Sequence, residues 1–306
     1  MLPKPPPRVG QIGFLYLPPY RIQGVSVAGE QTVVQLPELD VTFGIGLCPR
    51  IALSSPYVAI SHGHMDHVAG LPYYFSQRMF QRMGVGKCIC HPELADAINK
   101  MMQSWVELEK QNTKFEVIPL EPGAEFEIKR NIRIRAIEMS HTVTALGYAI
   151  IEYRSKLKEE LFGLPKEKLR ELKQKGVEIT RILESPLIAY TGDTEFGPFL
   201  FRDEFAEAKI IISECTFFES DHYSRAKIGK HLHVGDIAKL LSVWKAEAIV
   251  LVHASRRTNL GLSREMLSKL VGEEQASRVH FLMDHRANRL RYEKQLAEIE
   301  ALSSKS

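Results

Sequence analysis

Three histidines and an aspartate lie in one short turn that directly follows an apolar strand. Residues 57–60 are apolar and include two β-branched side chains, which predicts a buried strand. The turn that follows carries His62, His64, Asp66 and His67. His62 and His64 stand two residues apart, so an extended segment lets both reach one metal ion. Asp66 and His67 come as the chain turns into a helix, where they can reach a second ion. Imidazole and carboxylate suit zinc, and also manganese or iron, so ligand type does not fix the metal.

Four further predicted strands lead to a polar residue that can bind a metal. These residues are His141, Asp193, Glu214 and His253. Loops at strand ends are free to carry chemistry while the sheet holds them rigid. Surface or core histidines without a role are the alternative interpretation of the turn, and the additional candidate ligands weigh against it. Five converging strand ends therefore predict a single site.

The order of the predicted elements places the chain in the α/β class. The first half is rich in strands, and strands alternate with helices in the second half. Strands are expected at 24–28, 32–36, 39–43, 57–60, 115–119, 124–128, 132–138, 146–153, 187–191, 210–213 and 248–252. Helices are expected at 66–83, 92–111 and 166–175, after Gly197, from Val234 and near 263–271. We expect one domain over residues 1–306, with a charged insert at 154–186 and a helical C-terminal tail at 287–306.

Composition excludes several classes of protein. Among the 306 residues, 40 Lys and Arg stand against 37 Asp and Glu, and the net charge of +3 implies no overall preference for nucleic acid or membrane. No apolar run approaches the roughly 20 residues that span a bilayer, and the Pro-rich N-terminus is a poor secretory signal. Four cysteines are too few for a disulfide framework. These features predict a cytoplasmic protein without a membrane partner.

The order of the motifs resembles that of the metallo-β-lactamase superfamily. His-x-His-x-Asp-His at 62–67, the lone His141, Gly-Asp-Thr at 192–194 and the strand-end His253 follow one another as they do there. A finer similarity to ribonuclease Z is carried by segments 61–71, 140–148, 190–194, 214–217, 230–231 and 252–256. The resemblance spans residues 20–290 and implies a four-layer αβ/βα sandwich, with two mixed sheets and flanking helices.

The same resemblance implies a role for each candidate ligand. His62, His64 and His141 would hold one zinc ion, Asp66, His67 and His253 would hold the other, and Asp193 would bridge them. A carboxylate is well suited to span two cations a few ångströms apart, which agrees with that assignment. The implied activity is that of a dinuclear zinc-dependent phosphodiesterase that acts as an endonuclease on RNA, at the 3′ end of tRNA.

Hydrolysis also needs an acid for the leaving group and a group that handles the attacking water. His231 is the candidate acid, and in ribonuclease Z the histidine at this place pairs with a glutamate, which here is Glu214. Asp66 is the candidate to orient the water or accept its proton. His233 competes with His231 for the acid role, and a helix-start histidine without a role is the remaining interpretation of either.

The charged insert is the candidate surface for a partner. Residues 154–181 hold nine basic and five acidic side chains, which gives a net charge of +4. A phosphate-backbone contact with structured RNA, such as a tRNA precursor, is the functional interpretation, and a solvated helix face is the alternative. Ribonuclease Z enzymes usually carry a long Gly-Pro-containing arm that grips tRNA, and here the corresponding stretch is only the charged insert, so the long arm is expected to be absent. Arg256 and Arg257 could bind a substrate phosphate beside the metals. A homodimer is left open.

The chain departs from its relatives in the strand before the histidine cluster. Many relatives carry an aspartate there in a short Asp-x-Gly segment, whereas this chain has Gly44-Ile45-Gly46. A supporting carboxylate is therefore expected to be missing, unless Asp40 replaces it from nearby.

Other functions remain open on the same scaffold. A hydrolase of a small ester, thioester or phosphodiester is the alternative. The Glu214–His231 pair and the basic insert favour RNA, whereas the absent long arm favours the smaller substrate. A di-iron oxidoreductase would carry an acidic residue where His64 stands, together with a fused flavin domain. A metal-free binding module would have no need of a complete ligand set.

Overall fold

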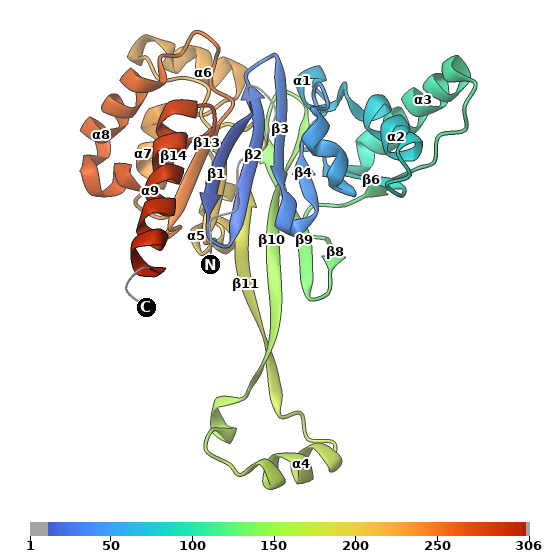
Figure 1. Cartoon of the computed structure of the whole chain (residues 1–306), viewed down its shortest axis with the longest axis vertical. Helices are drawn as coiled ribbons and strands as arrows, with labels where there is room; N and C mark the ends of the chain where they lie inside the picture. Colours follow the sequence, from blue (N-terminus) through green and yellow to red (C-terminus); the bar gives the residue numbers. More distant parts are fainter. Residues whose placement is uncertain (1–11, 304–306) are drawn as a thin grey trace.

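Two seven-stranded sheets form the centre of the computed structural model, which describes residues 12–303 (Figure 1). The first sheet runs in chain order: β1 (Gly13–Leu17), β2 (Tyr20–Val27), β3 (Gln31–Leu36), β4 (Val41–Phe43), β5 (Tyr57–Ala59), β6 (Gly86–Cys90) and β7 (Phe115–Pro119). The second runs β14 (Val279–Phe281), β13 (Ala248–Val252), β12 (Ile210–Glu214), β11 (Thr180–Tyr190), β10 (Thr144–Leu157), β9 (Ile132–Ser140) and β8 (Glu125–Lys129). Both sheets mix parallel and antiparallel pairs.

Helices cover the outer face of each sheet, and three apolar clusters hold the layers together. The helices are α1 (Met65–Val68), α2 (Leu71–Phe80), α3 (Pro92–Glu109), α4 (Lys166–Gln174), α5 (Asp203–Ala206), α6 (Tyr223–Gly229), α7 (Val234–Leu240), α8 (Leu260–Ser277) and α9 (His285–Ser303). One cluster joins the two sheets, a second joins α2 and α3 to the first sheet, and a third joins α5, α7 and α8 to the second sheet. The expected four-layer sandwich is confirmed.

The apolar sequences of the central strands fit this layered arrangement. β13 reads Ala-Ile-Val-Leu-Val and is buried throughout, because a parallel strand inside the sandwich is covered on both faces. The rings of Phe43 and Tyr190 stack 4.4 Å apart between the sheets. The Tyr148 hydroxyl donates to the Ile60 carbonyl at 2.6 Å, which ties β10 to the segment that leads into the histidine cluster.

Two sequence expectations need correction. β1 was not expected within the Pro-rich N-terminal segment. The helix expected at 66–83 is split into α1 and α2 at Gly70, whose N–H donates to the Ile45 carbonyl at 2.9 Å. A β-carbon at Gly70 would lie 2.2 Å from that carbonyl oxygen. The Pro-rich segment before residue 12 and the last three residues of the expected tail lie outside the described residues.

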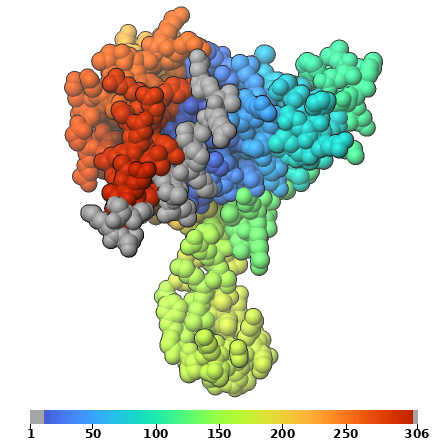
Figure 2. Space-filling view, viewed as in Figure 1, coloured from blue at the N-terminus to red at the C-terminus, as the bar shows by residue number. Residues whose placement is uncertain are grey.

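The 154–186 insert forms a projecting arm, where the sequence analysis expected no long arm. β10 and β11 extend beyond the expected 146–153 and 187–191 and pair from Tyr148 with Tyr190 out to Leu157 with Thr180. They continue past the sheets as a two-stranded ribbon with α4 at its far end (Figure 1). In the space-filling view this part stands clear of the body (Figure 2). Its pairing is local, so the ribbon can extend without a core of its own.

Candidate metal centre

The predicted site residues gather where the carboxyl ends of several strands meet. β11, β12 and β13 are parallel, so Asp193, Glu214 and His253, which end or follow them, share one edge of the second sheet. β9 points the same way and ends just before His141. In the first sheet, β5 runs toward this edge and is followed by His62. Residues almost 200 positions apart thereby face one another across the two sheets.

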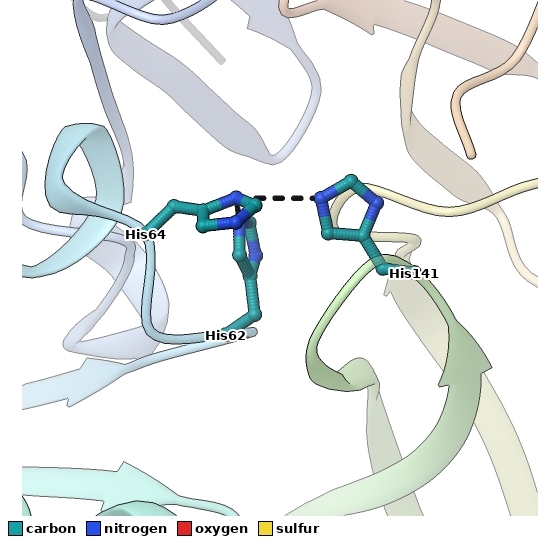
Figure 3. A group of neighbouring side chains, drawn as sticks. All are labelled: His62, His64 and His141. Carbon is teal, nitrogen blue, oxygen red and sulfur yellow. Dashed lines mark hydrogen bonds between the residues drawn. The ribbon is translucent and has the colours of Figure 1, made fainter. Parts of the chain in front are cut away.

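The first group consists of His62, His64 and His141, whose rings turn toward one another (Figure 3). Nε2 of His62 lies 3.0 Å from Nδ1 of His64, and Nε2 of His141 lies 3.4 Å from that same Nδ1. Three imidazole nitrogens that converge in this way can hold one tetrahedral cation and leave a fourth position open.

The second group consists of Asp66, His67 and His253. Oδ2 of Asp66 lies 3.3 Å from Nε2 of His253 and 3.6 Å from Nε2 of His67. Oδ2 of Asp193 lies 3.1 Å from the same nitrogen of His253, 3.3 Å from that of His67, and 3.8 Å from Nε2 of His62. One oxygen of Asp193 therefore faces both groups.

The electrostatics of these residues fit a bound cation. Nε2 of His67 is buried and makes no hydrogen bond, although the Asp193 carboxylate is within 3.3 Å. Burial lowers the pKa of His62 to about 2 and keeps that ring neutral, which is the form that binds metal. Burial opposes ionisation of Asp193, but the neighbouring His253 and His67 hold the pKa of its carboxyl well below the ordinary value. A neutral His62 ring beside ionised carboxylates is the form in which these groups bind a divalent cation.

Outer hydrogen bonds fix the rings of the first group. The Ser61 hydroxyl lies 3.1 Å from Nδ1 of His62, and the Lys230 carbonyl lies 3.0 Å from Nδ1 of His141. A carbonyl only accepts, so Nδ1 of His141 carries the proton and its Nε2 is free to bind a cation.

One carboxylate connects the second group to the candidate proton donor. Oε1 of Glu214 lies 2.9 Å from Nδ1 of His231 and accepts from the Thr194 backbone N–H at 2.8 Å. The Thr216 hydroxyl donates to Oε2 of Glu214 at 2.8 Å and lies 3.0 Å from Nδ1 of His253. Since that hydroxyl has one proton, it accepts from His253 and so leaves Nε2 of His253 free for the centre. Burial alone would lower the pKa of His231, but the Glu214 charge raises it to about 9.

His233 is engaged elsewhere. Its Nδ1 accepts from the Gly235 N–H at 3.1 Å, and its backbone N–H donates to Asp236, which forms a capping box at the start of α7. Its Nε2 lies 3.1 Å from the Glu219 carbonyl. Both ring nitrogens of His233 therefore serve local structure, whereas Nε2 of His231 has no partner among the described residues.

Two features of the backbone bring the sheets together at the centre. Gly192 has φ +61°, and a β-carbon there would lie 2.7 Å from Cβ of Ser61, so only glycine allows Asp193 to approach the histidine turn this closely. His253 also has positive φ, +62°, and its N–H donates to the Ser26 hydroxyl of β2 at 2.9 Å. An unusual backbone conformation held by the surrounding structure is typical of functional sites.

The structure resolves the expectation about Gly44 and Asp40. Gly44 has φ +68°, and a β-carbon there would lie 2.5 Å from the Thr32 carbonyl oxygen, so this backbone excludes a side chain. Asp40 precedes β4, at the opposite end of that strand from the site, and pairs with Lys129 at 2.8 Å. Asp40 does not replace the carboxylate of the relatives.

Arg256 does not have a free guanidinium, since it forms a bidentate pair with Glu30. Arg257 is exposed and has no carboxylate partner among the described residues. Thr216, Ser61 and the Lys230 carbonyl are contacts that the sequence analysis did not assign. A hydroxyl two residues beyond the strand-end Glu214 was a usable signal for Thr216, but a backbone carbonyl carries no sequence signal.

Comparison with known proteins places this geometry in a family. The model of the beta-lactamase superfamily domain matches residues 54–254. The chain is 31% identical over 255 residues to tRNase Z TRZ1 of Arabidopsis thaliana, covering 82% of this chain and 91% of the relative. It is 28% identical over 243 residues to ribonuclease Z of Pyrobaculum aerophilum, covering 74% of this chain and 76% of the relative.

The chain belongs to the metallo-β-lactamase superfamily. Within it, the chain belongs to the ribonuclease Z family, and it is a metal-dependent hydrolase. Solved structures support the fold of this superfamily member. Human tRNase Z, short form, superposes with a TM-score of 0.55 at 18% identity, covering 80% of this chain and 93% of the other. The Bacillus subtilis protein YhfI superposes with a TM-score of 0.57 at 13% identity, covering 88% and 94%.

Thr216→Val should weaken metal binding, because it removes the hydroxyl that holds His253 and Glu214 but keeps the shape of the side chain. We expect the affinity for Zn²⁺ to fall about tenfold, the lower end of the usual effect of an outer-shell partner. Competition with a chromogenic chelator measures it.

Thr216→Ser should retain the affinity of the wild type, since the hydroxyl is kept. Thr42→Val is the matched control, because Thr42 is also buried and its hydroxyl has no partner. Equal zinc affinity in Thr216→Val and the wild type would contradict the role of this hydroxyl.

Proposed function

We propose that this chain is a dinuclear zinc-dependent endonuclease of the ribonuclease Z type that cleaves RNA at the 3′ end of tRNA precursors. The observation that carries the proposal is the Glu214–His231 pair, which lies against both histidine groups. The His231 ring is 5.0 Å from that of His141 and 5.3 Å from that of His253. The relatives named tRNase Z and ribonuclease Z support the choice of substrate.

The ligand sets follow from the two groups around Asp193. His62, His64 and His141 would hold one ion, Asp66, His67 and His253 the other, and Asp193 would contact both. Two such ions supply charge neutralisation at the phosphate and activation of the attacking water. The residues of the chain supply orientation and proton transfer.

Asp66 orients the attacking water or accepts its proton, and His231 donates a proton to the leaving oxygen. The Gly29 N–H donates to Oδ2 of Asp66 at 3.0 Å, and His253 contacts the same oxygen, so this carboxylate is held in place beside the second group. Burial favours the neutral form of Asp66, but the neighbouring His253 and His67 lower the pKa of its carboxyl to about 2 and keep it ionised. His231 holds a proton at neutral pH, and its Nε2 donates it to the leaving oxygen while Glu214 stabilises the cation.

Metal content tests the dinuclear assignment. Purified wild-type protein loaded with Zn²⁺ should contain close to two ions per chain, measured by elemental analysis after gel filtration. Asp193→Ala should lose the most metal, because its carboxylate serves both groups, and His141→Ala should lose only the first ion. A folded wild-type protein that cleaves RNA after exhaustive chelation would contradict the assignment.

Cleavage of a tRNA precursor with a 3′ extension tests the activity and the acid together. His231→Ala should keep both metals but lower turnover by roughly 10²-fold or more, the usual scale for general acid catalysis. His233→Ala is the control at the neighbouring histidine and should affect stability more than turnover, because His233 caps α7. A large loss of turnover in His233→Ala, with His231→Ala unaffected, would reverse the assignment.

The arm carries exposed Lys and Arg side chains that could contact the phosphates of an RNA. Lys166, Arg170 and Lys173 are spaced i, i+4 and i+7 on α4, so they lie on one face of that helix. These three side chains and Lys156 are exposed and have no carboxylate partner in the described part of the chain. Neighbouring cations of the arm are neutralised, as Lys168 and Lys175 are by Glu171.

Reversing these four charges to glutamate should weaken binding of a tRNA-sized ligand and flatten its dependence on salt. Each neutralised phosphate contributes a log–log slope of about −0.7 to −0.9, and a salt titration of binding measures it. Turnover of a small chromogenic phosphodiester should not change, since the metal ligands lie in the body.

The same reversal of Lys100, Lys269, Arg289 and Lys294, which are exposed on α3, α8 and α9, is the control with equal net charge. A flat salt titration of the wild type would favour the small-substrate hydrolase instead.

Two further expectations stay predictions. Among residues 12–303, no helix is long and apolar enough to cross a membrane, and a cytoplasmic location is proposed. A homodimer could bury the exposed apolar side chains of Tyr73 on α2 and of Trp105 and Leu108 on α3.

A further inference from the structure

An aromatic ring flanked by a free cation lies directly beside the candidate proton donor. The Phe217 ring is 6.1 Å from the His231 ring, centroid to centroid, at an angle of 65°. The Phe217 backbone is fixed on both sides: its N–H donates to the Leu232 carbonyl at 3.4 Å, and its carbonyl accepts from the Val234 N–H at 2.9 Å. The position of the ring relative to His231 is therefore set by the fold.

The Phe217 side chain does not serve the core. Its neighbour Phe218 is fully buried and packs against Phe281 at 5.8 Å, so the core position of this segment is already filled. Phe217 is only half-buried, and its other ring contact is with His222 at 5.9 Å. An aromatic ring that is partly exposed next to catalytic groups is available to a ligand.

Cations without anionic partners accompany this ring. The Arg225 guanidinium carbon lies over one face of the Phe217 ring, 5.6 Å from its centroid. The Lys227 ammonium lies over the exposed Tyr223 ring, 5.1 Å from its centroid. Neither Arg225 nor Lys227 pairs with a carboxylate among the described residues, although both are exposed on α6. An aromatic face beside an uncompensated cation is the combination that binds the base and the phosphate of a single-stranded nucleotide.

We propose that Phe217 and Arg225 form a nucleobase-stacking subsite for the nucleotide that carries the leaving oxygen. This inference rests on the proposed endonuclease function. His231 must reach the leaving oxygen to protonate it, so the nucleotide attached to that oxygen lies next to the ring that adjoins His231. Its base stacks on Phe217, and Arg225 attracts its flanking phosphate. The contact positions the scissile phosphate without reading the base, since every base has a π-face.

The test removes the base and the ring separately and together. Two precursor RNAs are compared, one normal and one with an abasic residue at the nucleotide that ends in a free hydroxyl after the cut. For the wild type, kcat/KM should fall about tenfold on the abasic RNA, within the range that stacking of one base provides. On the normal RNA, the kcat/KM of Phe217→Leu should be about tenfold lower than that of the wild type. The kcat/KM of Phe217→Leu should be the same on the normal and the abasic RNA.

Phe80→Leu is the matched control, since Phe80 is 75% exposed on α2 and takes no part in the site. It should retain the full response to base removal. Zinc content and thermal unfolding of Phe217→Leu should match those of the wild type, which separates a lost contact from a damaged fold.

Three outcomes overturn the subsite. If Phe217→Leu still responds to base removal as the wild type does, the base stacks elsewhere. If the wild type cuts both RNAs equally, no base is bound on this side, and the endonuclease function stands alone. If the wild type cuts neither RNA, the proposed function fails and the subsite with it.

Discussion

The buried carboxylate of Asp193 is the constraint around which the two sheets are arranged. One of its oxygens faces imidazole nitrogens from both histidine groups within 3.8 Å, and its side chain is almost completely buried. A buried anion is costly unless positive charge compensates it. The ring of His62, which burial keeps neutral, supplies no net charge to this anion, and a bound divalent cation would compensate it. The close approach that places Asp193 there is possible only because Gly192 has no side chain.

Holding so many polar groups in place requires the strands to end together. Parallel β11, β12 and β13 deliver their last residues to one edge, and the turn after β5 meets them from the other sheet. Contacts between the sheets then lock the loops: the Ser26 hydroxyl of β2 accepts the His253 N–H, and Ala28 donates to the Ala254 carbonyl. The sandwich thus makes each half of the site dependent on the other, which is why ligands from distant parts of the sequence stay in register.

The sequence predicts those features of the site that neighbouring residues determine, but not those that depend on contacts with distant parts of the chain. His62, His141 and His253 follow strands with clear apolar patterns, so their convergence could be inferred from strand ends alone. The break between α1 and α2 could not, because Gly70 is forced by a carbonyl 25 residues earlier in the chain. Asp40 was a plausible substitute by sequence distance, but β4 carries it to the wrong end of the strand. The length of the arm was also hidden, because its strand extensions are charged and exposed and lack the alternation of a half-buried strand.

The buried centre and the exposed cations of the arm and α6 act through different physical interactions. The centre is buried and preorganised: burial keeps the His62 ring neutral, and the Glu214 carboxylate raises the pKa of His231. The arm and α6 are exposed and present cations that nothing in the described chain neutralises, so they act at longer range and respond to salt. A structured RNA would need both, because a distant electrostatic contact aligns the molecule but is too loose to position one phosphate. Phe217, whose backbone is hydrogen-bonded on both sides, lies between His231 and the exposed cations of α6, where these two kinds of interaction would meet.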